Sequence, residues 1–211
     1  MAIMERRQFI KGLAAATAAF SVKPALASPF TGRDNVSVMV EPPNYVGGGD
    51  YRLSKKFRRQ VVAYETKEKQ GTIVIDPSER FLYFVMEDGQ AMRYGVGVGR
   101  EGFAWAGRAR IQRKAEWPSW TPPAEMLKRR PDLTKYRGGM PGGPENPLGA
   151  RAMYLYKGSQ DTMYRIHGTN EPWTIGQAMS SGCIRLVNDD VTDLYERVKI
   201  GTRVVVLAAE V

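Results

Sequence analysis

Residues 165–190 read RIHGTNEPWTIGQAMSSGCIRLVNDD. This stretch holds His167, the only histidine of the 211-residue chain, and sixteen positions later Cys183, the only cysteine. A lone cysteine forms no internal disulfide, and one histidine with one cysteine does not make a four-ligand zinc site. Two interpretations remain open: an inert buried thiol, or a nucleophile that the histidine assists.

The pattern around these two residues favours proximity. His167 ends a strand-like run and Cys183 opens another, so two adjacent strands joined by a loop of 15 residues would bring them together. In the second run Cys183 and Arg185 alternate onto one face. There Arg185 can stabilise a thiolate or bind a substrate carboxylate. Gly182 allows close backbone approach, so the amides at residues 182 and 183 can form an oxyanion hole.

The segment that follows predicts a helix. Its apolar residues recur at positions i, i+3, i+4 and i+7: Val191, Leu194, Tyr195 and Val198. We expect Asn188 or Asp189 to cap the start of this helix and Gly201 to end it.

The rest of the domain reads mainly as strands. Residues 71–98 predict a three-stranded antiparallel meander, broken at Asp76-Pro77-Ser78 and at Asp88-Gly89. Further strands are expected at 108–117, 150–158, 162–169 and 202–209, and a short helix at 123–130. The predicted fold class is therefore mainly β, a sandwich or barrel-like domain with one or two short helices.

Residues 137–149, RGGMPGGPENPLG, are too rich in glycine and proline for regular structure. A loop of this length inside a domain is usually functional, so it predicts the wall or lid of a cleft; a surface excursion without function is the alternative. The four tryptophans, Trp105, Trp117, Trp120 and Trp173, either line that groove or pack into the core.

The N-terminus predicts export. Residues 1–27 have a basic start, an apolar middle and small residues at Ala25 and Ala27, as in a cleaved signal. Arg6-Arg7 resembles the twin-arginine signal; an ordinary secretory signal and an uncleaved anchor are the alternatives. We expect a linker over residues 28–58, a catalytic domain over 59–208, and no stable membrane span after cleavage.

The charge favours an anionic partner. The chain carries +9, and residues 1–27 contribute four basic and one acidic side chain, which leaves about +6. For an exported protein no nucleic-acid partner is expected, and a carboxylate-rich cell wall fits better. A charge that only aids solubility is the alternative.

The segment IHGTNEPWTIGQAMSSGCIRLVNDDVTDLYERV resembles the signature of the L,D-transpeptidase (YkuD-type, ErfK/YbiS-like) catalytic domain. That pattern is His-Gly-Thr, a loop of this length, Ser-x-Gly-Cys-x-Arg, an asparagine and a helix. Upstream, GTIVIDPSERFLYFV, WPSWTPP and GGPENPLGARAMYL resemble the family's opening hairpin, cleft wall and strand entry. The resemblance spans residues 59–207.

The resemblance implies acyl transfer on peptidoglycan stem peptides, with no cofactor and no metal. Cys183 would be the nucleophile and His167 the general base and acid. The carbonyl of Gly168 would orient the histidine, and the amides of Gly182 and Cys183 would bind the oxyanion. Arg185 matches the motif arginine, which has a substrate or a structural role.

The resemblance also leaves questions open. Many family members have histidine directly before Gly-Cys, where this chain has Ser181. The acceptor is an amine of a second stem peptide, an outer-membrane lipoprotein, a free D-amino acid or water. The implied location is the periplasm, at the cell wall.

The sequence leaves two other function classes open. A wall-binding module that kept the fold without catalysis would suit the basic charge and Ser181. A different Cys–His acyl enzyme is the second. In papain-like wall endopeptidases the cysteine precedes the histidine, which is not the order in this chain. Sortases have the histidine first, as here, but much further upstream, and they lack the His-Gly-Thr, loop and Ser-x-Gly-Cys block.

Overall fold

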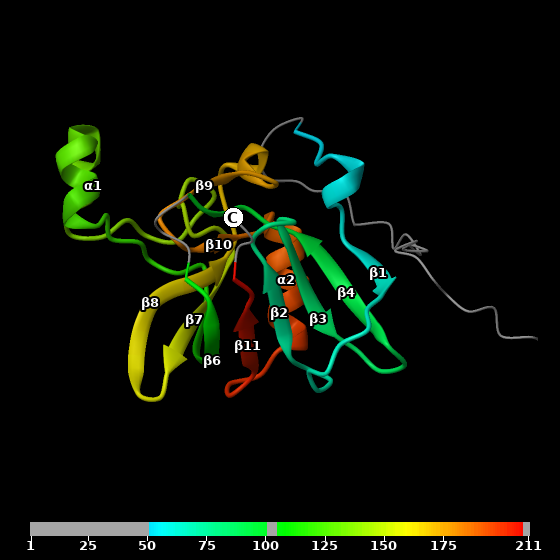
Figure 1. The fold of residues 1–211 in the computed structure, drawn as a ribbon. Helices are drawn as coiled ribbons and strands as arrows, with labels where there is room; N and C mark the ends of the chain where they lie inside the picture. Colours follow the sequence, from blue (N-terminus) through cyan, green and yellow to red (C-terminus); the bar gives the residue numbers. More distant parts are fainter. Residues whose placement is uncertain (1–50, 101–104, 209–211) are drawn as a thin grey trace, which may run out of the picture. The chain divides into compact units, whose positions relative to one another are not determined.

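The predicted mainly β fold class is confirmed. The computed structural model describes residues 51–100 and 105–208, and most of them belong to strands or to the loops between strands (Figure 1). The expected export signal at 1–27, and residues 28–50 of the expected linker, lie outside the described residues. In the described ranges, no helix has the length and apolar character needed to cross a bilayer.

The elements follow one another in chain order. They are η1 (Lys55–Phe57), β1 (Gln60–Ala63), β2 (Ile73–Asp76), β3 (Phe81–Val85), β4 (Gln90–Gly95), β5 (Val98–Gly99), β6 (Gly107–Glu116), α1 (Ala124–Arg129), η2 (Pro131–Tyr136), β7 (Arg151–Lys157), β8 (Gln160–His167), η3 (Pro172–Thr174), β9 (Ala178–Ser180), β10 (Ile184–Arg185), α2 (Asn188–Arg197) and β11 (Arg203–Val206).

Nine of the strands form one sheet in the order β1-β4-β3-β2-β11-β6-β7-β8-β10, and β5 pairs with β9 in a second, small sheet. The predicted meander is confirmed as the antiparallel strands β2, β3 and β4. The last strand, β11, joins the two halves of the large sheet, because it pairs in parallel with β2 and antiparallel with β6. This order leaves β8 and β10 together at one edge.

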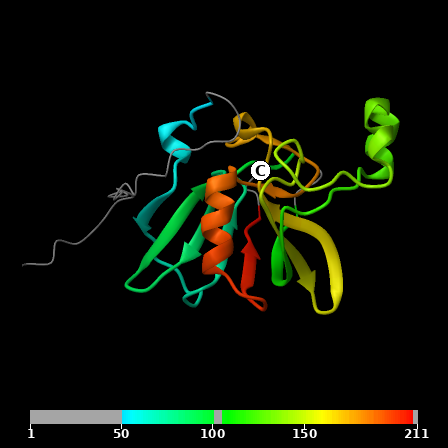
Figure 2. The same ribbon diagram turned by 180° about the vertical axis from the view of Figure 1, so that it is seen from behind.

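The core lies between the large sheet and α2, which stands in front of the sheet in Figure 2. The apolar stripe of the helix is buried as predicted: Val191 and Leu194 are fully buried and join one cluster with Ile166 of β8. The predicted cap is wrong. Val187 is the N-cap residue, and no side chain caps the helix. The predicted end at Gly201 is wrong too, because the helix ends at Arg197 with Val198 as its C-cap. The side chain of Asn188 bonds elsewhere, as described below.

The long segment between β6 and β7 forms an arm. The predicted short helix is confirmed as α1, which stands away from the sheet in Figures 1 and 2. The base of the arm is held where Trp120 and Met140 exchange backbone hydrogen bonds of 2.9 and 2.6 Å. The buried Asn146 side chain donates to the carbonyls of Pro118 and Pro141 at 3.0 and 2.9 Å. These bonds fix where the returning chain enters β7.

Candidate active site

The strand that ends at His167 and the strand that begins directly after Cys183 are neighbours. β10 pairs with β8 in parallel, with Ile184 opposite Ile166 and Arg185 opposite His167. Both isoleucines are buried in the core. Because successive side chains of a strand point to opposite faces, His167 and Arg185 lie on the other face. Cys183 directly precedes β10, and the backbone N–H of Arg165, two residues before His167, interacts with its thiol.

His167 is oriented by the next residue. Its Nδ1 lies 2.5 Å from the carbonyl oxygen of Gly168. A carbonyl oxygen only accepts, so the proton resides on Nδ1 and Nε2 is the basic nitrogen. Burial lowers the pKa of His167 to about 3; the positive charges of Arg185 and Arg165 act in the same direction, and the Gly168 carbonyl opposes them. The resting imidazole is therefore neutral.

Cys183 is a partly exposed thiol. Desolvation raises the pKa of this thiol, while the backbone N–H of Arg165 and the charges of Arg165 and Arg185 oppose the rise. The thiol and the imidazole are thus both neutral at rest. Such a pair reacts by proton transfer during attack, with the imidazole as general base.

The turn that presents Cys183 is shaped by Ser180. The Ser180 hydroxyl donates to the carbonyl of Cys183 at 2.6 Å and accepts the N–H of Gly182 at 3.1 Å. Gly182 has a φ of 112°, a conformation that favours glycine. Ser181 is exposed. Sequence reasoning singled out Ser181 and missed Ser180, although the Ser-x-Gly-Cys spacing is the signal for such a turn.

The segment that follows His167 is held in place by side-chain hydrogen bonds. Thr169 Oγ1 accepts the N–H of Glu171 at 2.9 Å, and Glu171 accepts a hydrogen bond of 3.1 Å from Arg185 Nη1. Asn188 Oδ1 accepts the N–H groups of Ala150 and Thr169 at 3.0 and 3.2 Å. The start of α2, the entry to β7 and the His-Gly-Thr segment are therefore joined at one amide oxygen.

One tryptophan has the expected role in the core, and two others are exposed. Trp105 packs against the core, with its ring centroid 5.3 Å from that of Tyr164. Trp117 and Trp173 are about half exposed, at 46% and 50%. Trp120 lies at the base of the arm.

The described residues contain no group of three or more His, Cys, Asp or Glu side chains arranged to hold a metal ion. The groups that the site does bring together are a thiol, a neutral imidazole with a basic Nε2 and two arginines. That set is suited to nucleophilic attack on an acyl carbon.

Comparison with known proteins agrees with this chemistry. Residues 70–206 match the family model of the YkuD L,D-transpeptidase catalytic domain. Two curated Escherichia coli relatives are a probable L,D-transpeptidase ErfK/SrfK, 35% identical over 71% of this chain and 47% of its own length, and a probable L,D-transpeptidase YbiS, 33% identical over 64% and 44%. The chain thus spans about half the length of these relatives.

A solved structure from Brucella melitensis, named a probable carnitine operon oxidoreductase CaiA, is 54% identical to this chain. It covers 74% of this chain and 96% of its own, with a TM-score of 0.51. That name gives a different reaction class from the names of the curated relatives. The family model covers well over half of the chain, including both candidate catalytic residues. The chain belongs to the YkuD L,D-transpeptidase family.

Proposed function

We propose that this chain is a peptidoglycan L,D-transpeptidase with Cys183 as its nucleophile and His167 as its proton shuttle. The parallel pairing of β8 and β10 supports the proposal, because it sets Arg185 opposite His167 and Ile184, the residue after Cys183, opposite Ile166. Membership of the family supplies the substrate class.

In the proposed reaction the thiol of Cys183 attacks the carbonyl carbon between the third residue of the stem, a diamino acid, and the fourth, D-Ala. His167 Nε2 takes the thiol proton as the carbon–sulfur bond forms, and it returns that proton to the D-Ala nitrogen as the carbon–nitrogen bond breaks. A thioester remains. An amine then attacks the thioester, His167 accepts its proton, and the thiol is regenerated.

The remaining site residues take supporting roles in this proposal. The Gly168 carbonyl stabilises the imidazolium that forms on His167. The N–H of Gly182 is already donated to Ser180, so the N–H of Cys183 is the stronger candidate for the oxyanion hole. Arg185, paired with Glu171, supplies positive charge near the developing thiolate. Ser181, exposed beside the turn, borders the substrate.

The acceptor and the cellular setting are part of the proposal. We favour the diamino-acid side chain of a second stem, which gives a 3→3 cross-link, over a lipoprotein, a free D-amino acid or water. The proposed domain spans residues 59–208, after a linker at 28–58 and a twin-arginine export signal at 1–27. The enzyme would then act in the periplasm, at the cell wall.

The test is mass spectrometry of products from a defined disaccharide-tetrapeptide, with and without an acceptor stem, using the full chain. We expect D-Ala release, a mass increase on Cys183 and a cross-linked dimer when acceptor is present. Cys183→Ala should lose all three, with its circular dichroism spectrum unchanged. Release of D-Ala without a dimer would identify a carboxypeptidase. Full activity of Cys183→Ala would refute the proposal, and binding without any adduct would favour a wall-binding module.

A further inference from the structure

A row of three side chains crosses the sheet toward Cys183. Arg113 of β6 pairs with Tyr154 of β7, and Tyr154 pairs with Arg165 of β8. Cys183 directly precedes β10, whose Ile184 pairs with Ile166 of β8, and its thiol interacts with the backbone N–H of Arg165. The residues on either side of Tyr154, Met153 and Leu155, are in the core. The row therefore lies on the opposite face, the one that carries the candidate catalytic residues.

The two arginines flank one aromatic ring. Arg113 Cζ lies 4.4 Å and Arg165 Cζ 4.5 Å from the centroid of the Tyr154 ring. Stacking on an aromatic ring holds a guanidinium in place while its N–H edges stay available for a planar, charged partner. Tyr154 is almost completely buried, so it is a fixed support for both guanidiniums.

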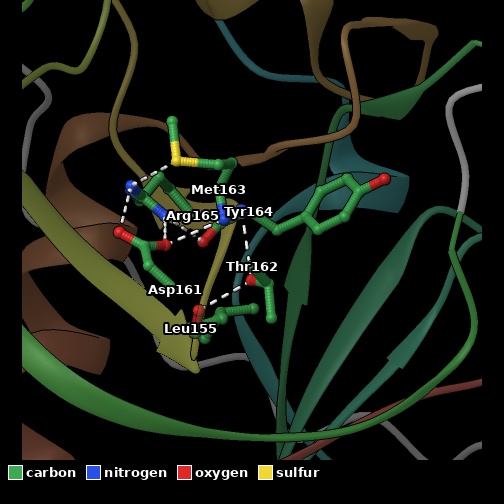
Figure 3. Close-up of polar contacts among 6 residues, drawn as sticks. All are labelled: Leu155, Asp161, Thr162, Met163, Tyr164 and Arg165. Atoms are coloured by element: carbon green, nitrogen blue, oxygen red, sulfur yellow. Dashed lines mark hydrogen bonds and ion pairs between the residues drawn. The ribbon is translucent and has the colours of Figure 1, made fainter. Parts of the chain in front are cut away.

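A bulge in β8 fixes Arg165. In a regular strand, residues four apart lie about 13 Å from each other, yet Asp161 and Arg165 form a two-bond fork of 2.7 and 2.9 Å. The register of β8 shifts between these residues, where Met163 has a φ of 63°. The regular backbone pairing of β7 with β8 is interrupted here, and Thr162 Oγ1 donates a hydrogen bond of 2.7 Å to the Leu155 carbonyl (Figure 3). Bulges beside active sites commonly redirect a side chain in this way.

The row has more positive than negative charge. Asp161 neutralises Arg165, whereas no carboxylate in the described part of the chain lies within ion-pair distance of the exposed Arg113. Arg185, the arginine that the sequence motif offers for substrate binding, already donates to Glu171 at 3.1 Å. Arg113 is therefore the better placed guanidinium for an incoming carboxylate, with Arg165 closer to the thiol.

We propose that Arg113, Tyr154 and Arg165 form a recognition site for a carboxylate of the donor stem peptide. This inference rests on the proposed function for its substrate class. Asp161 takes one N–H from each terminal nitrogen of Arg165, so a carboxylate held by Arg113 would reach Arg165 through its remaining N–H groups. A carboxylate bound there would hold the stem along the sheet and direct its scissile carbonyl toward Cys183. Either the free carboxylate of the second residue or that of the diamino acid has the required chemistry.

Binding and acylation are measured separately to test this site. Full-length Cys183→Ala is titrated calorimetrically with the tetrapeptide L-Ala-γ-D-Glu-diaminopimelate-D-Ala. It is also titrated with two variants of this peptide, one amidated at the carboxylate of the second residue and one at the free carboxylate of the diaminopimelate. We expect one amidation to weaken binding about tenfold, as for a lost charge-assisted hydrogen bond. That peptide identifies which carboxylate is bound. Adding Arg113→Gln to Cys183→Ala should weaken binding of the unmodified peptide about tenfold as well. It should not weaken further the binding of the amidated peptide that has lost the recognised carboxylate.

The controls separate this site from a general effect of charge. Arg110→Gln removes another exposed arginine of β6 and should leave binding unchanged. The double variant Asp161→Asn/Arg165→Gln removes the second guanidinium without leaving a lone carboxylate, and it should also bind about tenfold more weakly. Equal affinities for free and amidated peptides, or equal effects of the Arg110 and Arg113 variants, would overturn the inference. Carboxylate-dependent binding with no acylation of wild-type Cys183 would support the site and refute the proposed function.

Discussion

Asn188 Oδ1 accepts the backbone N–H of Thr169 at 3.2 Å. Thr169 follows Gly168, whose carbonyl holds His167 Nδ1. One side chain at the start of α2 therefore positions the peptide that orients the candidate base. Gly168 is confined by the same contact, because a Cβ at this position would collide with Asn188 Oδ1 and lie 3.0 Å from the backbone nitrogen of Ala150.

Replacing Asn188 should slow acylation through His167. Asn188→Ala removes the acceptor, and we expect an acylation rate about 10- to 100-fold lower with little change in KM, since small displacements of catalytic groups are costly. Asn188→Asp keeps an acceptor oxygen and should restore most of the rate. The readout is single-turnover mass spectrometry of the Cys183 adduct. Equal rates for the two variants would show that Asn188 does not position the base through this oxygen.

The sequence predicted the elements that follow from periodicity. The antiparallel meander, the strand that ends at His167, and α2 with its buried Val191 and Leu194 occur as predicted. The strand expected to open at Cys183 begins one residue later, at Ile184. These features depend on local patterns of apolar residues, which a single chain displays directly.

The features that were missed depend on tertiary partners. Asn188 has the sequence signal of a helix cap, but its side chain serves two backbone N–H groups from distant segments. The Asp161–Arg165 fork needs a bulge whose register is set by the pairing with β7. No pattern along one strand shows how its neighbour aligns, so neither contact could be predicted from local sequence.

Ser180 and Ser181 offer a matched test of the cysteine turn. Ser180→Ala removes the hydroxyl that bonds both Gly182 and Cys183, and we expect about a tenfold slower acylation because the turn loses two hydrogen bonds. Ser181→Ala changes an exposed side chain and should stay within twofold of wild type, as expected for a surface change. Single-turnover rates measure both. A larger loss of acylation rate in Ser181→Ala than in Ser180→Ala would show that Ser181, and not Ser180, is the functional serine.

The reactivity of Cys183 should rise at high pH. Burial raises the pKa of this thiol, so less thiolate is present at neutral pH than in an exposed cysteine, and alkylation should accelerate as pH rises through the raised value. Because the chain has one cysteine, the total rate with iodoacetamide reports on this site, and a free cysteine peptide is the control. The Asp161→Asn/Arg165→Gln variant should shift the profile to still higher pH, since Arg165 opposes the rise. A profile at or below that of the peptide would contradict the prediction.

The contribution of Asp190 to folding stability should fall as pH rises through the titration of this carboxyl. This carboxyl is almost completely buried and lies 3.8 Å from Arg59 Nε. Burial raises its pKa to about 7, Asp193 and Asp189 add to the rise, and Arg59 opposes it. In the unfolded chain an aspartate has a pKa of about 3.9. Between these two pH values Asp190 is protonated in the folded state and ionised in the unfolded state. The stabilisation that comes from this bound proton is complete below about pH 4 and is lost as pH approaches 7.

Urea unfolding at pH 5 and pH 8 measures this effect. Buried, neutral His167 acts in the opposite direction between these pH values, because its pKa is lowered to about 3, so the prediction compares the variant with the wild type. Asp190→Asn should raise the midpoint at pH 8 relative to the midpoint at pH 5, because an amide does not titrate. Asp132→Asn is the matched control: this carboxyl is exposed and paired with Arg130, and its pKa is lowered rather than raised. Its loss should leave the difference between pH 5 and pH 8 unchanged. If Asp190→Asn and Asp132→Asn both retain the wild-type difference, Asp190 is ionised in the folded protein at pH 5, and Arg59 outweighs the cost of burying its charge.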